Sequence, residues 1–242
     1  TDPEQADTSG DGFDDHLKWG PLRDLGVEVN PAEIDVYIEM DQAEYAEQLQ
    51  RRQLSLIGGT MSRETGDDMP RVNMHFEECD LRADDVHTTA DLDERAREQH
   101  EARGYGFHYF FVNSGMVQFE GELVPGVAKS STRGPSWVMA DVDPDESASE
   151  QASLVAHEFG HAFGIHDGSF DGVDSREYSA TRYNSVMNYN LDHTVTFSTG
   201  SPFDDYAEMR RNDFGQRFQS QHALEQAWED GELPAEQPCG GF

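Results

Sequence analysis

The chain has 242 residues, with 17 Lys and Arg against 49 Asp and Glu, which gives a formal net charge of −32 and a sequence pI of about 4.3. So acidic a surface repels phosphate, and no Lys/Arg cluster interrupts it, so we expect no nucleic-acid partner. No run approaches the roughly 18 apolar residues of a membrane span, and no signal peptide opens the sequence, so an exported protein would be in its mature form. Aromatic residues make up 10% of the chain, which predicts a sizeable core.

Four segments have the pattern of β-strands. Residues 35–40 alternate between polar and apolar side chains, as in a half-buried strand, and residues 71–77 form a second such segment. The aromatic run at 105–112 has the composition of a central strand. Residues 137–140 form a short fourth strand.

Helical patterns alternate with these strands. Asp41, with Glu44 three residues later, predicts the start of a helix that the Gly58-Gly59 pair stops. In the best-defined helix, Ser147 and Glu150 form a capping box and Gly164 marks the end. The other predicted helices cover residues 91–103, 204–211 and 220–230.

The order of these elements predicts an α/β fold with a twisted, mostly parallel sheet backed by helices. We expect an acidic N-terminal segment at residues 1–30 and one main domain at residues 31–242. Strands and helices alternate up to the end of the best-defined helix, and the remaining chain is irregular. The main domain is therefore divided into an N-lobe at 31–164 and a small C-lobe at 165–242.

The best-defined helix carries the sequence His157-Glu158-Phe159-Gly160-His161. Residues four apart lie on one helix face, so both imidazoles can bind one metal ion. Two histidine nitrogens suit Zn²⁺, and a third ligand would leave the fourth position for water. Glu158 is placed to act as general base on that water without binding the metal. Gly164 lets the chain turn back to offer the third ligand.

Further along the chain lies Ser185-Val186-Met187-Asn188-Tyr189. Together with the histidine motif, this segment resembles the metzincin clan of zinc endopeptidases, in which a Met-containing turn follows H-E-x-x-H-x-x-G-x-x-(H/D). The resemblance is specific over about residues 150–189. It implies a metzincin-like catalytic domain, with Met187 beneath the metal. It also implies that Tyr189 binds zinc or stabilises the oxyanion, as in serralysin- and astacin-like members.

The third ligand departs from the commonest form of this pattern. Asp167 occupies the usual histidine position, and His166 lies one residue before it. Snapalysin-like metzincins carry Asp at this place, so the resemblance implies Asp167 as the ligand. The alternatives are His166 and loop acids such as Asp171 or Asp174.

A second motif opens the chain and resembles the calcium loops of thrombospondin type 3 and dockerin-like repeats. Its twelfth place, where a bidentate Glu is expected, is Lys18. The alternative is a solvated acidic leader. The predicted Ca²⁺ ligands are Asp7, Ser9, Asp11, Phe13 (through its carbonyl) and Asp15.

The acidic residues are spread along the whole chain, which predicts a protein that works in concentrated salt, from a halophile. The alternative is a generic acidic secreted protein. The two cysteines, Cys79 and Cys239, predict a disulfide outside the cell, with two unpaired thiols as the alternative.

The sequence thus predicts a secreted or cell-surface, salt-adapted zinc endopeptidase that acts on a peptide or protein and is expected to be a monomer. Two other functions stay open. One is a catalytically silent relative that binds a peptide or partner in the same cleft. The other is a zinc hydrolase that acts on a non-peptide amide.

Overall fold

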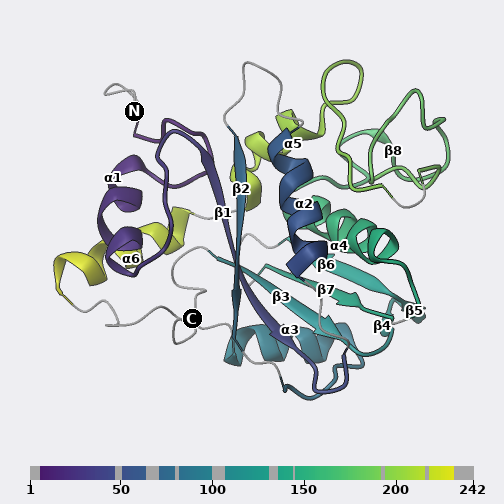
Figure 1. Cartoon of the computed structure of the whole chain (residues 1–242), viewed down its shortest axis with the longest axis horizontal. Helices are drawn as coiled ribbons and strands as arrows, with labels where there is room; N and C mark the ends of the chain where they lie inside the picture. Colours follow the sequence, from purple (N-terminus) through teal and green to yellow (C-terminus); the bar gives the residue numbers. More distant parts are fainter. Residues whose placement is uncertain are drawn as a thin grey trace.

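A five-stranded sheet forms the centre of the molecule in the computed structural model (Figure 1). Four strands run parallel and the fifth, β6, is antiparallel and lies at one edge. The predicted α/β class with a mostly parallel sheet is confirmed. Across the sheet, the strands are β2 (Val72–Glu78), β1 (Ile34–Gln42), β3 (His108–Asn113), β7 (Trp137–Asp141) and β6 (Gly126–Lys129).

The described residues are 6–46, 51–63, 71–79, 82–99, 107–130, 136–143, 145–191, 194–215 and 218–231. Within them, β4 (Val117–Phe119) and β5 (Glu122–Val124) form a hairpin, and β8 (Asp171–Asp174) is a short strand after the sheet. The helices are α1 (Asp15–Leu17), η1 (Lys18–Leu22), α2 (Arg51–Arg63), α3 (Thr89–Glu98), α4 (Ala148–Ala162), α5 (Asp205–Arg211), η3 (Asp213–Gly215) and α6 (Phe218–Glu229).

Helices cover both faces of the sheet. In β3, the Phe110 ring packs edge-on against Phe159 of α4, with ring centroids 5.4 Å apart. The next residue, Phe111, lies 4.8 Å beneath the guanidinium of Arg95 from α3. Successive side chains of a strand point to opposite faces, so α3 and α4 lie on opposite sides of the sheet. Helix α2 packs against α4 and therefore shares its side (Figure 1).

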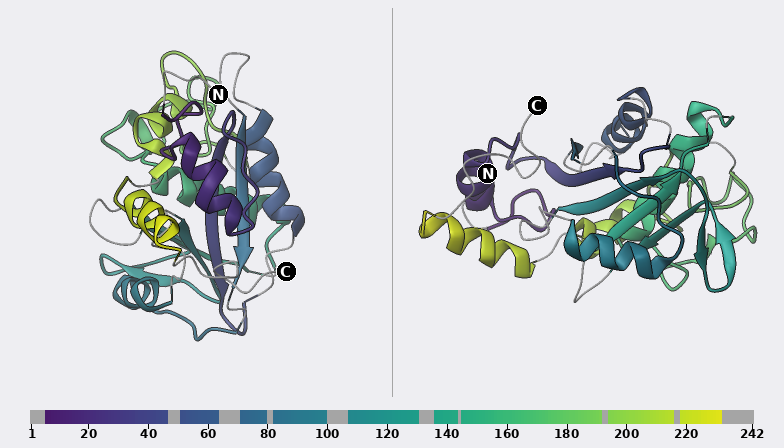
Figure 2. Two further views of the ribbon diagram at one scale, coloured as in Figure 1. Left: turned by 90° about the vertical axis from the view of Figure 1, so that its left-hand side faces the viewer. Right: turned by 90° about the horizontal axis from the view of Figure 1, so that it is seen from below.

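The N-terminal segment packs against the C-terminal helix. Both views in Figure 2 place α1 and η1 beside α6. The indole Nε1 of Trp228 donates to Asp24 at 2.8 Å, and His16 contacts Glu225 at 3.0 Å. A second, smaller core lies between these elements and the sheet. Its buried residues are Phe13, Leu22, Leu25, Val27, Tyr37, Phe107 and Leu224.

The helix expected after Asp41 is placed differently. Asp41 lies inside β1, where its buried carboxylate accepts a hydrogen bond from the Tyr109 hydroxyl at 2.7 Å. Helix α2 begins at Arg51 and runs through the Gly58-Gly59 pair to Arg63. Packing against α4 and β2 outweighs the low helix propensity of the two glycines.

The other predicted elements fall close to their expected places. The capping box of Ser147 and Glu150 opens α4, and Thr88 with Asp91 opens α3. The β4–β5 hairpin and β8 were not predicted, because each strand has only three or four residues and no clear alternation. None of the helices in the described ranges has the length and hydropathy of a membrane span.

The continuity of helix α2 through the Gly58-Gly59 pair can be tested by substitution. A Cβ added at Gly59 meets nothing within 4 Å, and the backbone there is helical. Gly59→Ala should therefore raise the free energy of unfolding by about 0.5–1 kcal/mol and the thermal midpoint by about 1–4 °C. Gly121→Ala is the matched control, because its Cβ also meets open space but its φ is +92°. That variant should be destabilised in the same thermal scan; a destabilised Gly59→Ala would contradict the continuous helix.

Candidate metal centre

Helix α4 presents both histidines of the motif to one point. The Nε2 atoms of His157 and His161 lie 3.2 Å apart, and the two imidazole rings are nearly perpendicular to each other. The helix ends at Ala162, and Gly164, two residues later, has a φ of +102°, which residues with a side chain rarely adopt. The predicted one-turn spacing therefore brings the two imidazoles together.

Two backbone carbonyls fix the orientation of these rings. His157 Nδ1 lies 3.0 Å from the Val186 carbonyl oxygen, and His161 Nδ1 lies 2.8 Å from that of Ile165. A carbonyl only accepts, so each Nδ1 carries the hydrogen and donates it. In the neutral rings both Nε2 atoms then hold a lone pair, which is the form that binds a metal.

Asp174, at the end of β8, completes the group. Its Oδ1 lies 3.2 Å from His157 Nε2 and 3.3 Å from His161 Nε2. These three residues form a group that could hold a metal ion. Asp174 has a φ of +53°, a left-handed conformation that Asp tolerates better than most residues. The backbone strain thus coincides with the residue whose side chain must reach the histidines.

The expected third ligand is corrected by this arrangement. Asp167 and His166 are both exposed and lie outside the group. The His166 ring instead turns back on its own loop, where its Nδ1 accepts from the Gly168 N–H at 3.2 Å. Asp174 is one of the loop acids that the sequence left as alternatives, and the path of the chain through β8 selects it.

The donor set fits a zinc ion. Asp174 Oδ1 is buried and has no hydrogen-bond partner among the described residues, although two imidazole nitrogens lie beside it. Three lone pairs therefore converge, which is unfavourable without a positive charge between them. A point equidistant from three atoms spaced 3.2–3.3 Å apart lies about 1.9 Å from each, close to the 2.0–2.1 Å of zinc–ligand bonds.

The residues of this group shift one another's pKa values. Burial raises the pKa of Asp174, but the two imidazoles outweigh burial and hold it well below its usual range. Burial lowers the pKa of His161, but Asp174 outweighs it and raises the pKa to about 9. Both shifts arise because the carboxylate and the imidazoles lie so close together.

Glu158 lies beside the group without joining it. Its side chain is 6% exposed, and none of the described residues donates a hydrogen bond to its carboxylate. Burial raises its pKa, while His157 and His161 act in the opposite direction. A buried carboxylate with free acceptor capacity next to a metal site is suited to accept a proton.

The segment around Met187 supports two of the three candidate ligands. The Val186 carbonyl accepts from His157, and the Met187 carbonyl accepts from the backbone N–H of Asp174 at 3.0 Å. Met187 is buried against α4 at Gly160, where an added Cβ would lie 2.3 Å from its sulfur. Gly160 thus leaves the space that Met187 fills beneath the histidines.

A buried carboxylate that the sequence did not single out ties this segment to α5. Asp205 accepts from the Tyr183 hydroxyl at 2.8 Å and from the Ser198 N–H at 2.8 Å. The Ser185 hydroxyl, in turn, accepts from the Met187 N–H at 3.1 Å. No short motif marks Asp205, because its partners come from separate parts of the chain.

Tyr189 lies at the rim of the centre. Its ring stacks on His157 with centroids 5.6 Å apart, and 46% of the residue is exposed. Burial and the charges of Asp174 and Glu158 raise its pKa to about 12. Its hydroxyl is therefore protonated at neutral pH and can donate a hydrogen bond.

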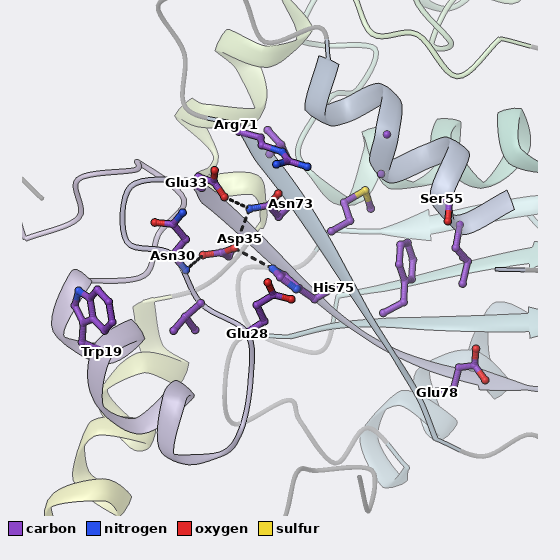
Figure 3. A pocket seen from close by; sticks show the side chains of 17 residues that line it. Trp19, Glu28, Asn30, Glu33, Asp35, Ser55, Arg71, Asn73, His75 and Glu78 are labelled. Carbon is purple, nitrogen blue, oxygen red and sulfur yellow. Dashed lines mark hydrogen bonds and ion pairs between the residues drawn. The ribbon is translucent and has the colours of Figure 1, made fainter. Parts of the chain in front are cut away.

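A separate cavity lies away from the candidate metal centre. It measures about 1180 Å³ and lies along the free edge of β2, with none of the metal-centre residues in its lining. Figure 3 shows Asp35 within it, surrounded by Asn30, Asn73 and His75, with a distance of 2.9 Å to the His75 ring. This cavity is therefore distinct from the candidate metal centre.

The predicted calcium loop uses its oxygen atoms in another way. The structure does not bring the Asp7, Asp11 and Asp15 carboxylates together as a metal-ligand group. Asp7 accepts from two backbone N–H groups of the loop, and Asp15 accepts from the N–H and hydroxyl of Thr8. The Phe13 side chain is buried in the smaller core.

The ammonium group of Lys18 is buried among oxygen atoms of this region, including that of the predicted ligand Asp11. Lys18 is fully buried, with its Nζ 2.5 Å from Asp11 Oδ2 and 3.1 Å from Asp35 Oδ2. It also donates to the Ser9 hydroxyl at 3.1 Å and to the Glu33 carbonyl at 2.8 Å. The lysine at the twelfth place of the loop, which weakened the calcium prediction, thus places a positive charge beside Asp11.

The predicted disulfide between Cys79 and Cys239 lies only partly within the described residues. Cys79, next to the end of β2, is disulfide-bonded, whereas Cys239 lies outside the described residues. Cys79 also lies near Glu39 and Asp41, but a sulfur in a disulfide is no thiolate ligand, so these three residues form no candidate metal site.

The choice of third ligand can be tested by substitution. Asp174→Asn keeps the shape and tolerates the left-handed backbone but removes the charge, so zinc affinity should fall by more than about 100-fold. Asp167→Asn, the matched control, should change it by less than about 2-fold, because Asp167 is exposed and outside the group. Competition against a chromophoric chelator measures both dissociation constants. The reverse ranking would restore Asp167 as the ligand.

The contribution of the buried Lys18 to stability can also be tested by substitution. Lys18→Met leaves the Asp11 and Asp35 carboxylates buried without their cation, so the free energy of unfolding should fall by about 3–5 kcal/mol. The control is Lys129→Met, because the Lys129–Asp93 pair is partly exposed and should contribute about 0–1 kcal/mol. Urea unfolding at fixed salt measures both. Equal losses, or a wild-type midpoint that calcium chloride raises, would contradict this account of the loop.

Comparison with known proteins shows a distant likeness among solved structures. The sequence matches no protein-family model and shows no match to a characterised protein. Among solved structures, the fold is similar to metalloproteinase-II from Bacteroides fragilis, with a TM-score of 0.46 and 12% sequence identity. The match covers 79% of this chain and 60% of that one. So distant a likeness carries no argument about activity or substrate, which must come from the site itself.

Proposed function

We propose that this protein is a zinc-dependent endopeptidase whose ion is held by His157, His161 and Asp174. The observation that carries the proposal is the convergence of three lone pairs at 3.2–3.3 Å, next to a buried carboxylate that has no hydrogen-bond donor among the described residues. The metzincin-like sequence of residues 150–189 supports the peptidase class.

The chain's own residues supply a proton path for hydrolysis. When bound, zinc would lower the pKa of a water molecule and polarise the carbonyl of the scissile bond. Glu158 accepts the proton of the attacking water at a carboxylate oxygen and delivers it to the nitrogen of the leaving amine. The Tyr189 hydroxyl, protonated at neutral pH, donates to the oxygen that becomes negative in the transition state.

The edge of the sheet supports an extended peptide as the substrate. Strand β6 pairs only with β7 among the described strands, so its other edge can pair with a further strand. The same strand borders α4 and the Glu158 carboxylate. The neighbouring strand β7 lies between β3 and β6, so both of its edges are already paired.

Secretion and adaptation to salt form part of the proposal. The disulfide at Cys79 supports an oxidising compartment outside the cytosol. The net charge of −32 supports a medium in which concentrated salt screens the self-repulsion of the chain.

The decisive substitution is Glu158→Gln. This change keeps the shape of the side chain and removes the base, so kcat for an internally quenched peptide should fall by about 10²–10⁴-fold. Zinc content, measured by elemental analysis, should stay at the wild-type level because Glu158 is not a ligand. A zinc chelator should abolish wild-type cleavage, and added zinc should restore it.

Other outcomes would select the competing functions. Stoichiometric zinc with no cleavage of a peptide library by the wild type would favour a silent peptide-binding relative. Release of ammonia or an amine from small amides, without internal peptide cleavage, would favour a non-peptide hydrolase. A wild-type protein that binds no transition metal would remove the basis of the proposal.

A further inference from the structure

The Glu158 carboxylate lies against the backbone of β6 at Gly126. A Cβ built on Gly126 would lie 2.6 Å from Glu158 Oε1 and 2.7 Å from Leu154 Cδ1. Both distances are shorter than real Cβ contacts allow, so the carboxylate occupies space that only glycine leaves open. Strand β6 and helix α4 pack side by side at this point (Figure 1).

We propose that Gly126 is a positioning residue for the general base. The inference rests on the proposed function and adds a requirement to it: the first residue of β6 must lack a side chain so that the Glu158 carboxylate can lie beside the candidate metal centre. Neither the histidine motif nor the Met-containing segment includes Gly126, which lies 32 residues before Glu158 in the sequence.

Backbone conformation does not explain why residue 126 is a glycine. Gly126 does not have a positive φ, and it pairs with Ala140 in the regular register of β6 and β7. Any residue could adopt this extended conformation. The requirement for glycine therefore comes from the two side chains that face it.

A side chain at position 126 would displace the Glu158 carboxylate and leave the backbone almost unchanged. The two atoms that a Cβ would meet are the ends of flexible side chains, so they can shift while the backbone stays in place. The carboxylate would shift readily because none of the described residues donates a hydrogen bond to it. The ligands would stay, because carbonyls of Val186, Ile165 and Met187 hold them.

The consequence for hydrolysis is a misplaced proton acceptor. A displacement of about 1 Å in a reacting group can lower a rate by about 10²-fold. Zinc affinity and the binding of the peptide to the cleft do not use the Glu158 carboxylate. The loss should therefore fall on kcat and leave KM nearly unchanged.

The test compares Gly126→Ala with wild type in the full chain. We expect kcat for the quenched peptide to fall by about 10–100-fold, with KM and the zinc dissociation constant within about 2-fold of wild type. The matched control is Gly115→Ala, whose Cβ meets nothing within 4 Å and whose φ is not positive; it should keep wild-type kcat.

A second measurement tests the contact without using catalysis. In the zinc-free protein, Gly126→Ala should lower the thermal midpoint, and the drop should be smaller when Glu158 is also replaced by Ala, because the crowded carboxylate is then gone. Such coupling is the signature of two residues in contact. Equal drops in the two backgrounds would overturn the inference.

The outcomes also separate this inference from the proposed function. An inactive wild type that binds no zinc refutes the proposed function, whereas the stability measurement still reports on the contact. An active wild type with an equally active Gly126→Ala refutes the positioning role alone. Loss of zinc in Gly126→Ala would also refute it, because the substitution would then act on the ligands.

Discussion

The candidate metal centre depends on one electrostatic constraint: two imidazole nitrogens and one carboxylate oxygen are held with their lone pairs directed at a common point. Such an arrangement is repulsive until a positive charge enters it. The side chains alone would relax away from one another, so the rest of the fold must hold them. The hydrogen bonds from His157 and His161 to backbone carbonyls and the left-handed backbone of Asp174 provide that restraint.

One segment connects helix α4, which carries the histidines, to strand β8, which carries Asp174. Residues 185–188 give a carbonyl to His157 on α4 and another to the backbone of Asp174 on β8. Met187 fits against Gly160, so the segment cannot withdraw from α4 without opening a void in the core. Asp205 then anchors the neighbouring chain from α5. Side chains far from the centre thus keep its geometry, as a preorganised site requires.

The sequence predicted those features that depend on local geometry. The spacing of His157 and His161 on a capped helix places both side chains on one face of that helix, one turn apart. Asp174 could not be chosen in the same way, because its position depends on the turn of β8 and on pairing with a segment 13 residues later in the chain. Helix α2 was misplaced for a related reason: tertiary packing outweighed the local signals of Asp41 and the glycine pair.

The N-terminal loop has a consequence for how the molecule depends on its surroundings. Its cation is covalently attached, as the end of the Lys18 side chain, and is enclosed by oxygen atoms of residues 9, 11, 33 and 35. A tethered ion cannot be diluted away, exchanged for sodium in brine or extracted by a chelator. At this point of the N-terminal segment, the positive charge that balances the buried Asp11 and Asp35 carboxylates therefore comes from the chain itself.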